Sequence, residues 1–216
     1  MIVHHLERSR SQRLLWLLEE LELDYTLRTY ERTEAARAPA ALREVHPLGK
    51  SPVLQHGEVV LAESGAIVEH VLDELAGGRL RPPPGTEEHR RYRFFLHFAE
   101  GSMGAPLLAK LLFDRVRRAV PFLGNVIANK VDAAFTLGEI RAHLAFVEDA
   151  LDGREWLAGD ELTGADIMMG YPLSAALERG RLTERFPRIE AYLARHTARP
   201  AYQRALAKGG PFGLPR

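Results

Sequence analysis

The stretch HPLGKSPVLQHGEVVLAESGAIV, residues 46–68, carries the clearest fold signal in this chain. Two short runs rich in apolar residues, 53–56 and 59–61, are separated by Gly57 and one further residue, a pattern typical of a β-hairpin. Ser64 then begins a helix, because the apolar residues that follow it recur at helical spacing. A hairpin followed directly by an amphipathic helix indicates a small α/β domain.

Upstream of this stretch, strand and helix patterns alternate. A short strand is expected at residues 2–4, followed by a helix over 14–21 with leucines at helical spacing. A second strand is expected at 25–30, and an Ala-rich stretch, 34–43, is expected to be helical. Together with the hairpin and its helix, these elements give the order βαβαββα.

A segment rich in glycine and proline, residues 77–85, cannot continue a helix and separates two parts of the chain. Beyond it, amphipathic helical patterns dominate and strand signals are weak. These patterns cover 87–120, 137–151, 165–177, 189–195 and 202–208. Around residues 122–135, Pro121 and Gly124 predict an irregular connection or a short helix. We therefore expect an α/β domain over 1–78, a linker over 79–86 and an all-α domain over 87–216.

Composition limits the function. The 216 residues are 46% hydrophobic, and 29 Lys and Arg balance 29 Asp and Glu, so neither a nucleic acid nor a membrane is expected as a partner. The N-terminus shows no secretory leader and no apolar run approaches a membrane span, which predicts a cytoplasmic protein. There is no cysteine, so sulfur chemistry must use a ligand's thiol, and the nine histidines show no zinc spacing. We expect no metal site.

Three short motifs lie where predicted strands end and helices or loops begin. They are Ser9–Arg13, His46–Pro52 and Glu63–Ile67. Each brings a hydroxyl, a cation or a helix N-terminus to the loops at the end of a sheet, where small anionic ligands are bound. Their combination indicates a binding site for a small anionic ligand.

These motifs, the proline-rich linker and the segment Trp156–Ile167 resemble those of the cytosolic glutathione transferases, particularly the serine-using, theta-like enzymes of bacteria and fungi. The resemblance covers nearly the whole chain. It implies a thioredoxin-like N-terminal domain that binds glutathione as a co-substrate, with no metal. It also implies a helical domain that holds a small hydrophobic electrophile, and a homodimer.

Ser9 is the catalytic residue that the resemblance implies. It falls between a predicted strand and a helix beginning near Ser11, where a hydroxyl and backbone N–H groups can stabilise a thiolate. The serine then donates a hydrogen bond and is not itself the nucleophile. Arg10 and Ser11 are alternative partners of the sulfur, and a plain helix N-cap is the alternative role for Ser9 or Ser11.

For glutathione binding, the resemblance implies Lys50, Ser51, Pro52, Glu63 and Ser64. Lys50 can pair with the glycyl carboxylate and the Ser51 backbone with the cysteinyl unit, and a cis Ser51–Pro52 bond is expected. Glu63 can pair with the α-amino group, and Ser64 with the α-carboxylate at a helix N-terminus. Without the resemblance, Lys50 is an ordinary loop lysine and Glu63–Ser64 an ordinary helix start.

The electrophile is expected between the loop Leu6–Arg8, a helix carrying Phe98, Met103 and Leu107, and the C-terminal tail around Phe212. These apolar residues are also compatible with an ordinary core.

In the helical domain, the segment from Thr163 to Asp166 has the spacing of a capping box, so Asp166 is expected to be structural.

The predicted function is conjugation of glutathione to a small, apolar electrophile, in detoxification. The alternatives are a glutathione-dependent peroxidase and a non-catalytic protein that binds glutathione or other ligands with the same fold.

Overall fold

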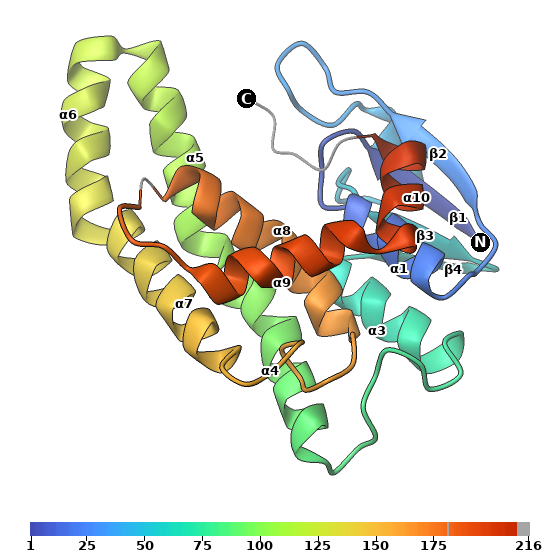
Figure 1. Ribbon diagram of the computed structural model, residues 1–216. Coiled ribbons are helices and arrows are strands. Elements are labelled where there is room, and N and C mark those ends of the chain that lie inside the picture. Colours follow the sequence, from blue (N-terminus) through green and yellow to red (C-terminus); the bar gives the residue numbers. More distant parts are fainter. Residues whose placement is uncertain (181, 211–216) are drawn as a thin grey trace. The chain divides into compact units, whose positions relative to one another are not determined.

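The computed structural model describes residues 1–180 and 182–210. The chain forms two compact units (Figure 1). The first contains Met1–His89 and the described residues from Arg195 onward, and the second contains Arg90–Ala194. The boundaries between the units fall within two helices, α4 and α9.

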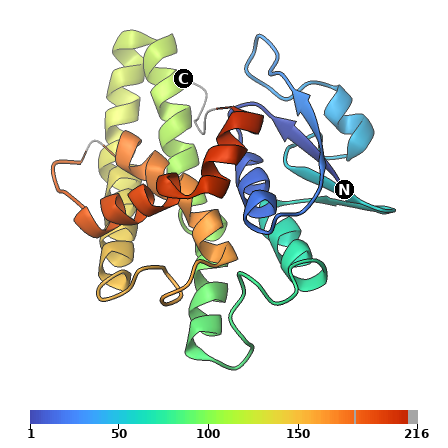
Figure 2. The ribbon, with the colours of Figure 1, turned by 45° about the vertical axis from the view of Figure 1, so that its right-hand side comes forward.

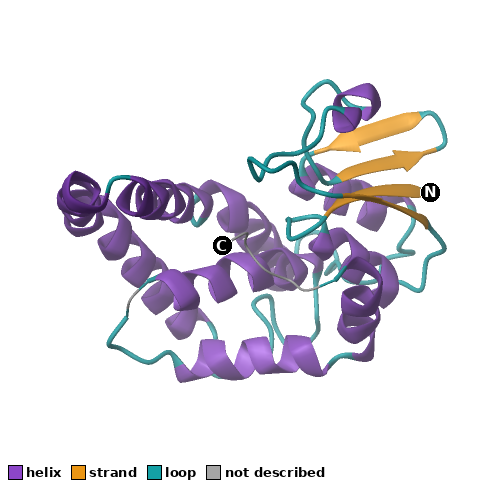
Figure 3. Cartoon of the chain, turned by 90° about the horizontal axis from the view of Figure 1, so that it is seen from above, coloured by secondary structure: helices purple, strands orange, loops and turns teal. Residues whose placement is uncertain are grey.

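The first unit is built around a four-stranded sheet in the order β2-β1-β3-β4, drawn in orange in Figure 3. Strand β1 runs parallel to β2 and antiparallel to β3, and β3 and β4 form the expected hairpin. Its elements are β1 (Ile2–Leu6), α1 (Gln12–Glu20), β2 (Thr26–Tyr30), α2 (Ala41–Val45), β3 (Val53–His56), β4 (Val59–Ala62) and α3 (Ser64–Glu74). The thioredoxin-like order βαβαββα is confirmed.

Adjacent histidines of β1, His4 and His5, are both buried. Consecutive side chains of a strand point to opposite faces of its sheet, so the two imidazoles lie in different surroundings. His4 Nδ1 lies 2.9 Å from the Tyr30 hydroxyl and Nε2 lies 2.8 Å from Gln55 Oε1. Both rings therefore fill the interior with their polar atoms paired, as buried polar groups require.

The last described helix, α10 (Pro200–Gly209), packs along α1 within the first unit (Figure 2). Arg199 makes a two-pronged contact with Glu20, with N···O distances of 2.5 and 2.8 Å. Glu19 accepts a 2.9 Å bond from Arg204 Nε and a further bond from Lys208. Acids on α1 and bases on α10 therefore hold the two helices together.

The second unit is helical in its described residues. It comprises α4 (Glu87–Gly101), α5 (Gly104–Ala119), α6 (Pro121–Val131), the π-helical turn η1 (Asp132–Thr136), α7 (Leu137–Ala150), α8 (Gly164–Arg179) and α9 (Pro187–Ala198). Helix α8 is buried along most of its length, which places it in the core of this unit. Over residues 1–180 and 182–210, no helix is both long and apolar enough to span a membrane.

One local prediction was wrong, and another was confirmed in one of its two alternatives. Of the Ala-rich stretch 34–43, only the part from Ala41 is helical, because Pro39 disfavours helix in the residue before it and Ala36 adopts a positive φ of 56°. In the second unit, α6 is the short helix that was one of the two alternatives for residues 122–135, and it continues through η1 into α7. Proline is tolerated at a helix start because its missing N–H would have no intrahelical partner there.

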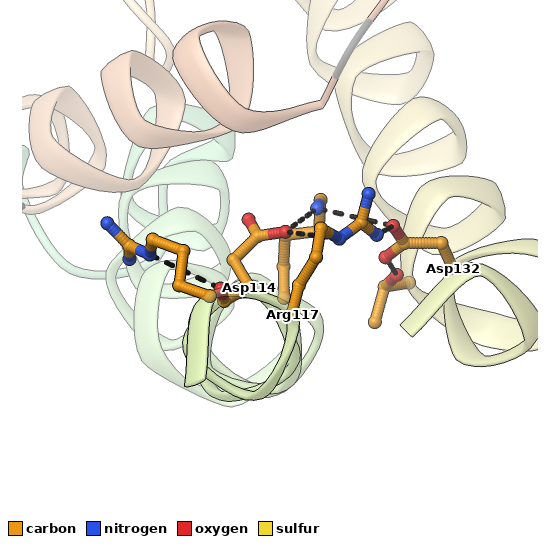
Figure 4. A network of polar contacts seen from close by, with 6 residues as sticks. Asp114, Arg117 and Asp132 are labelled. Carbon is orange, nitrogen blue, oxygen red and sulfur yellow. Dashed lines mark hydrogen bonds and ion pairs between the residues drawn. The ribbon is translucent and has the colours of Figure 1, made fainter. Parts of the chain in front are cut away.

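A cluster of charges anchors η1 to α5 (Figure 4). Lys110 is fully buried, and its Nζ lies 2.6 Å from Asp114 Oδ1 and 3.3 Å from Asp132 Oδ2. Asp132 also accepts bonds from Arg117, at 2.8 Å, and from Thr136, at 2.6 Å. Burial by itself raises the pKa of Asp132, but these donors outweigh it and lower the pKa, so the carboxylate is ionised at neutral pH.

Candidate functional site

The three motifs meet at one end of the sheet. The Ser51 hydroxyl accepts a bond from the Leu6 N–H, at 3.1 Å, and donates to the His4 carbonyl, at 2.9 Å, so this loop is fastened to the end of β1. In the β3–β4 hairpin Val53 pairs with Ala62, so the residues flanking this pair, Pro52 and Glu63, lie at the same end of the sheet. The Ser51–Pro52 bond is cis, as the resemblance implied.

Ser9 and Ser11 lie in the turn between β1 and α1, with their hydroxyl oxygens 2.7 Å apart. Ser11 is fully buried; its Oγ lies 2.8 Å from His5 Nδ1, accepts from the Leu6 N–H at 3.2 Å and lies 3.3 Å from the Leu6 carbonyl. Ser9 is only half-buried, and its Oγ accepts the Ser11 N–H at 3.2 Å. Of the two hydroxyls, that of Ser9 is therefore the more accessible to a ligand.

The structure also bears on the alternatives to Ser9. Ser11 occupies the N-cap position of α1, but its side chain makes no capping hydrogen bond. Arg10 is exposed in the same turn, and the neighbouring Arg13 is 2% exposed within α1. Buried guanidinium groups belong to the architecture of a protein more often than to a solvent-facing site.

Lys50, Glu63 and Ser64 lack partners within the part of the chain that the structure describes. Lys50 and Glu63 are exposed and make no ion pair there, and the Ser64 hydroxyl makes no hydrogen bond there. Ser64 begins α3, and the first N–H groups of a helix have no intrahelical acceptor. A cation, an acid and a helix N-terminus at one end of the sheet suit a ligand that carries carboxylates as well as an amine.

The backbone at Glu63 is strained. Its φ and ψ are 72° and 120°, and only glycine adopts positive φ readily. Such a conformation costs of order 1–3 kcal/mol and is commonest at ligand sites. The strain lies in the turn between β4 and α3, directly before Ser64.

Asp166 is a structural residue, as expected. It is fully buried and receives bonds from the Thr163 N–H and hydroxyl, at 2.8 and 2.7 Å, which completes the capping box of α8. It also accepts from the Leu157 N–H and from the Tyr192 hydroxyl, both at 2.9 Å. Burial raises the pKa of this carboxyl, although these four bonds oppose the shift.

The expected electrophile pocket draws on residues of both units and stays a prediction. Met103 and Leu107 are 1% and 8% exposed, and Phe98 belongs to an aromatic cluster that includes Phe94 and Phe146. Phe212 lies outside the described residues.

The approach of Gly209 to His5 and to α1 had no signal in the sequence. His5 Nε2 lies 2.8 Å from the carbonyl oxygen of Gly209, the last residue of α10. A Cβ at position 209 would lie only 2.3 Å from Gln12 Oε1 and 2.4 Å from Leu15 Cδ1, so any larger residue would have to displace these side chains. The two partners are 204 positions apart, beyond the reach of motif spacing.

Within residues 1–180 and 182–210, no group of three or more His, Cys, Asp or Glu side chains is arranged to hold a metal ion.

Known proteins resemble both units. Residues 2–73 match the family profile "Glutathione S-transferase, N-terminal domain", and residues 110–195 match "Glutathione S-transferase, C-terminal domain". The chain is 32% identical to glutathione S-transferase 1 of Saccharomyces cerevisiae over 98% of this chain and 96% of that protein. It is 30% identical to glutathione S-transferase 3 of Schizosaccharomyces pombe, over 96% and 87%. A glutathione S-transferase crystal structure from Actinobacillus pleuropneumoniae superimposes with a TM-score of 0.83 and 36% identity, covering 99% and 94%.

Proposed function

Because the chain belongs to the glutathione S-transferase family of enzymes, we propose that it activates the glutathione thiol at Ser9 and transfers the thiolate to a small, apolar electrophile. The observation that carries the proposal is the difference between the two serines. The Ser9 hydroxyl is half-buried at the N-terminus of α1, whereas the Ser11 hydroxyl is sealed inside the protein.

The energy required is within reach of this turn. A thiol with a pKa near 8.5 is mostly protonated at neutral pH, and lowering that pKa by two units takes about 2.7 kcal/mol of preferential thiolate stabilisation. A hydrogen bond to a charged group contributes about 1.5–3 kcal/mol. The N-terminal end of α1 adds a favourable interaction with negative charge. Proximity to the bound electrophile then supplies much of the remaining acceleration.

The side chains of Lys50, Glu63 and Ser64, which lack partners in the described part of the chain, support glutathione as the bound peptide. Lys50 binds the glycyl carboxylate, and the Ser51 backbone beside Pro52 binds the cysteinyl unit. Glu63 binds the α-amino group and Ser64 the α-carboxylate. This arrangement matches each charge of the tripeptide with an opposite charge or a helix N-terminus.

The proposal extends to the rest of the enzyme. Residues 1–78 bind glutathione, and the segment 87–216 supplies the electrophile pocket of a cytoplasmic, homodimeric detoxification enzyme. Exposed apolar side chains on α5 and α6, among them Leu112 at 49% and Leu123 at 57%, support self-association. Light scattering tests this part, because a strictly monomeric mass contradicts the dimer.

Ser9→Ala tests the chemistry. We expect the variant to bind glutathione with little change, because Lys50, Glu63 and Ser64 are intact, and to lose the low pKa of the bound thiol together with conjugation. Binding is measured by calorimetry, the thiolate by its ultraviolet absorbance, and turnover with an activated aryl halide. Ser174→Ala, which removes a hydroxyl bonded to the Gly170 carbonyl on α8, is the matched control.

The outcomes separate the candidates. Unchanged turnover in Ser9→Ala excludes Ser9 as the activator. A wild-type protein that binds glutathione but never lowers the thiol pKa is a non-catalytic binding protein. A protein that turns over hydroperoxides but no carbon electrophile is a peroxidase, and failure to bind glutathione contradicts all three readings.

A further inference from the structure

We propose that Ser11 and His5 are positioning residues that carry the thiol proton of glutathione inward, from Ser9 through Ser11 to the imidazole of His5. This inference rests on the proposed function, because it requires glutathione to lie against Ser9. It assigns a role to a buried histidine and to the C-terminal end of α10.

The hydrogen bonds set a direction. A carbonyl oxygen only accepts, so the 2.8 Å contact with Gly209 places the proton of His5 on Nε2 and leaves Nδ1 as an acceptor. Ser11 therefore donates its hydroxyl proton to Nδ1, at 2.8 Å. Its oxygen then accepts the hydroxyl proton of Ser9, at 2.7 Å. Without ligand, each donor in the chain points inward from Ser9.

Because Ser9 donates its proton inward, it presents an oxygen lone pair to a ligand, and this lone pair can accept the S–H of a thiol. To stabilise a thiolate, Ser9 must instead donate outward, so the chain must reverse. The reversal balances if the S–H bond breaks and a proton passes to Ser9, the Ser9 proton passes to Ser11, and the Ser11 proton passes to His5 Nδ1. The products are a thiolate accepting from Ser9 and an imidazolium that donates to Ser11 and to Gly209.

Two helix ends favour this direction of transfer. The hydrogen-bond chain from Ser9 to His5 begins at the N-terminus of α1, where negative charge is stabilised. It ends at the C-terminus of α10, where a protonated histidine is stabilised. The Gly209 carbonyl is one of the last carbonyls of α10, which have no intrahelical donor. Both dipoles therefore act to move the proton from the sulfur to His5.

Burial keeps the resting ring of His5 neutral. Burial lowers its pKa, while the Gly209 carbonyl and the carboxylate of Glu7 partly oppose that shift. The other hydrogen-bond partner of the ring is the hydroxyl of Ser11, the residue before α1. A neutral ring has the bare Nδ1 that the transfer needs, and a thiolate at the outer end of the chain favours a proton at the inner end.

The competing arrangement is a Ser9 hydroxyl that turns outward alone. In that case Ser9 gives up its bond to Ser11, His5 stays neutral, and the thiol proton leaves for the solvent. The two arrangements differ in where one proton goes, so they are separated by counting the protons released on binding.

The experiment measures proton release and thiolate formation together at pH 7. Glutathione is titrated into the full-length protein by calorimetry in buffers of different ionisation enthalpy, and ultraviolet absorbance gives the thiolate formed. S-methylglutathione, which has no thiol proton, corrects for other ionisations. We expect the wild-type protein to release far less than one proton per thiolate.

Two variants interrupt the hydrogen-bond chain from Ser9 to His5. In His5→Asn the amide oxygen takes the place of Nδ1 as an acceptor but takes up no proton, and Ser11→Ala removes the middle hydroxyl. For both we expect release of about one proton per thiolate. We also expect turnover to fall about tenfold, equivalent to one pKa unit. His4→Gln removes the adjacent buried histidine and is the control that leaves the proton balance unchanged.

Release of one proton per thiolate by the wild-type protein overturns the inference while leaving Ser9 activation intact. Equal proton release by the wild type and His5→Asn has the same consequence, even if the variant is less stable. Absence of any wild-type thiolate signal contradicts the proposed function itself. Retention of the proton in the wild type and His4→Gln, with its release in the two chain variants, establishes the relay.

Discussion

Replacing Glu19 with alanine should loosen α10 from α1. The Glu19 carboxylate, about 8% exposed, accepts the Tyr25 hydroxyl at 2.8 Å and Arg204 Nε at 2.9 Å, and it also pairs with Lys208. The bond from Tyr25 is part-buried and contributes about 1 kcal/mol. The two bases are about half exposed, so solvent screens them and each contributes about 0.5–1 kcal/mol. We expect a total loss of about 2–3 kcal/mol in the free energy of unfolding.

The assay is urea unfolding followed by tryptophan fluorescence. The Trp16 ring on α1 lies 5.2 Å from the ring of Tyr202 on α10, so it reports on this pair of helices, whereas Trp156 belongs to the second unit. With a slope of 2–3 kcal/mol per molar urea, the midpoint should fall by about 1 M. Glu31→Ala, at an exposed position, is the control.

The loss should depend on pH. Burial by itself raises the pKa of Glu19, but the bonds from Lys208, Tyr25 and Arg204 outweigh it and lower the pKa below its ordinary 4.5. The stabilisation is thus complete above 4.5 and is lost as the pH falls through the lowered value, where Glu19 becomes protonated. A loss below about 0.5 kcal/mol at pH 7, or an equal loss in acid, would refute the reasoning.

Three further changes test other parts of the molecule. Asp166→Ala leaves four donors unpaired, the Thr163 N–H and hydroxyl, the Leu157 N–H and the Tyr192 hydroxyl, and should destabilise the protein by about 3–5 kcal/mol in urea unfolding; a loss under 1 kcal/mol contradicts a structural role. Gly209→Ala forces a methyl group against α1 and should cost about 1–3 kcal/mol in the same assay, whereas unchanged stability means that α10 does not approach so closely. Glu63→Gln removes the charge proposed for the α-amino group and should raise the KM for glutathione about tenfold without changing the pKa of the bound thiol, and an unaltered KM excludes that pairing.

The parts of the fold that the sequence predicted are those with local causes. The β3–β4 hairpin follows from two apolar runs around Gly57, whose φ of 61° suits a tight turn. The α8 capping box follows from residues three positions apart. The continuous path from α6 to α7 had no such local signal, because it depends on Asp132 meeting Lys110 of α5, 22 positions earlier in the chain.

The same distinction applies to the candidate site. Ser9, Lys50 and Glu63 were identified because each lies in a short motif next to a strand end. The packing of α10 on α1 was not predicted, since the pairing of Glu19 with Arg204 joins residues 185 positions apart. The contact between His5 and α10 depends on that packing, so the sequence could not predict it either.

Recognition and activation of glutathione have opposite structural requirements. A binding group must exchange water for ligand, and Lys50 and Glu63, the binding residues that we propose, are exposed and have no partner in the described chain. A proton path needs preformed short hydrogen bonds, and in the path that we propose the hydroxyl of Ser11 and the ring of His5 are buried and paired. S-methylglutathione should therefore engage the first set and raise the thermal midpoint nearly as much as glutathione, by mass action on the folded state. A much smaller rise would show that the sulfur itself contributes to affinity, and that the two sets of residues are energetically coupled rather than separate.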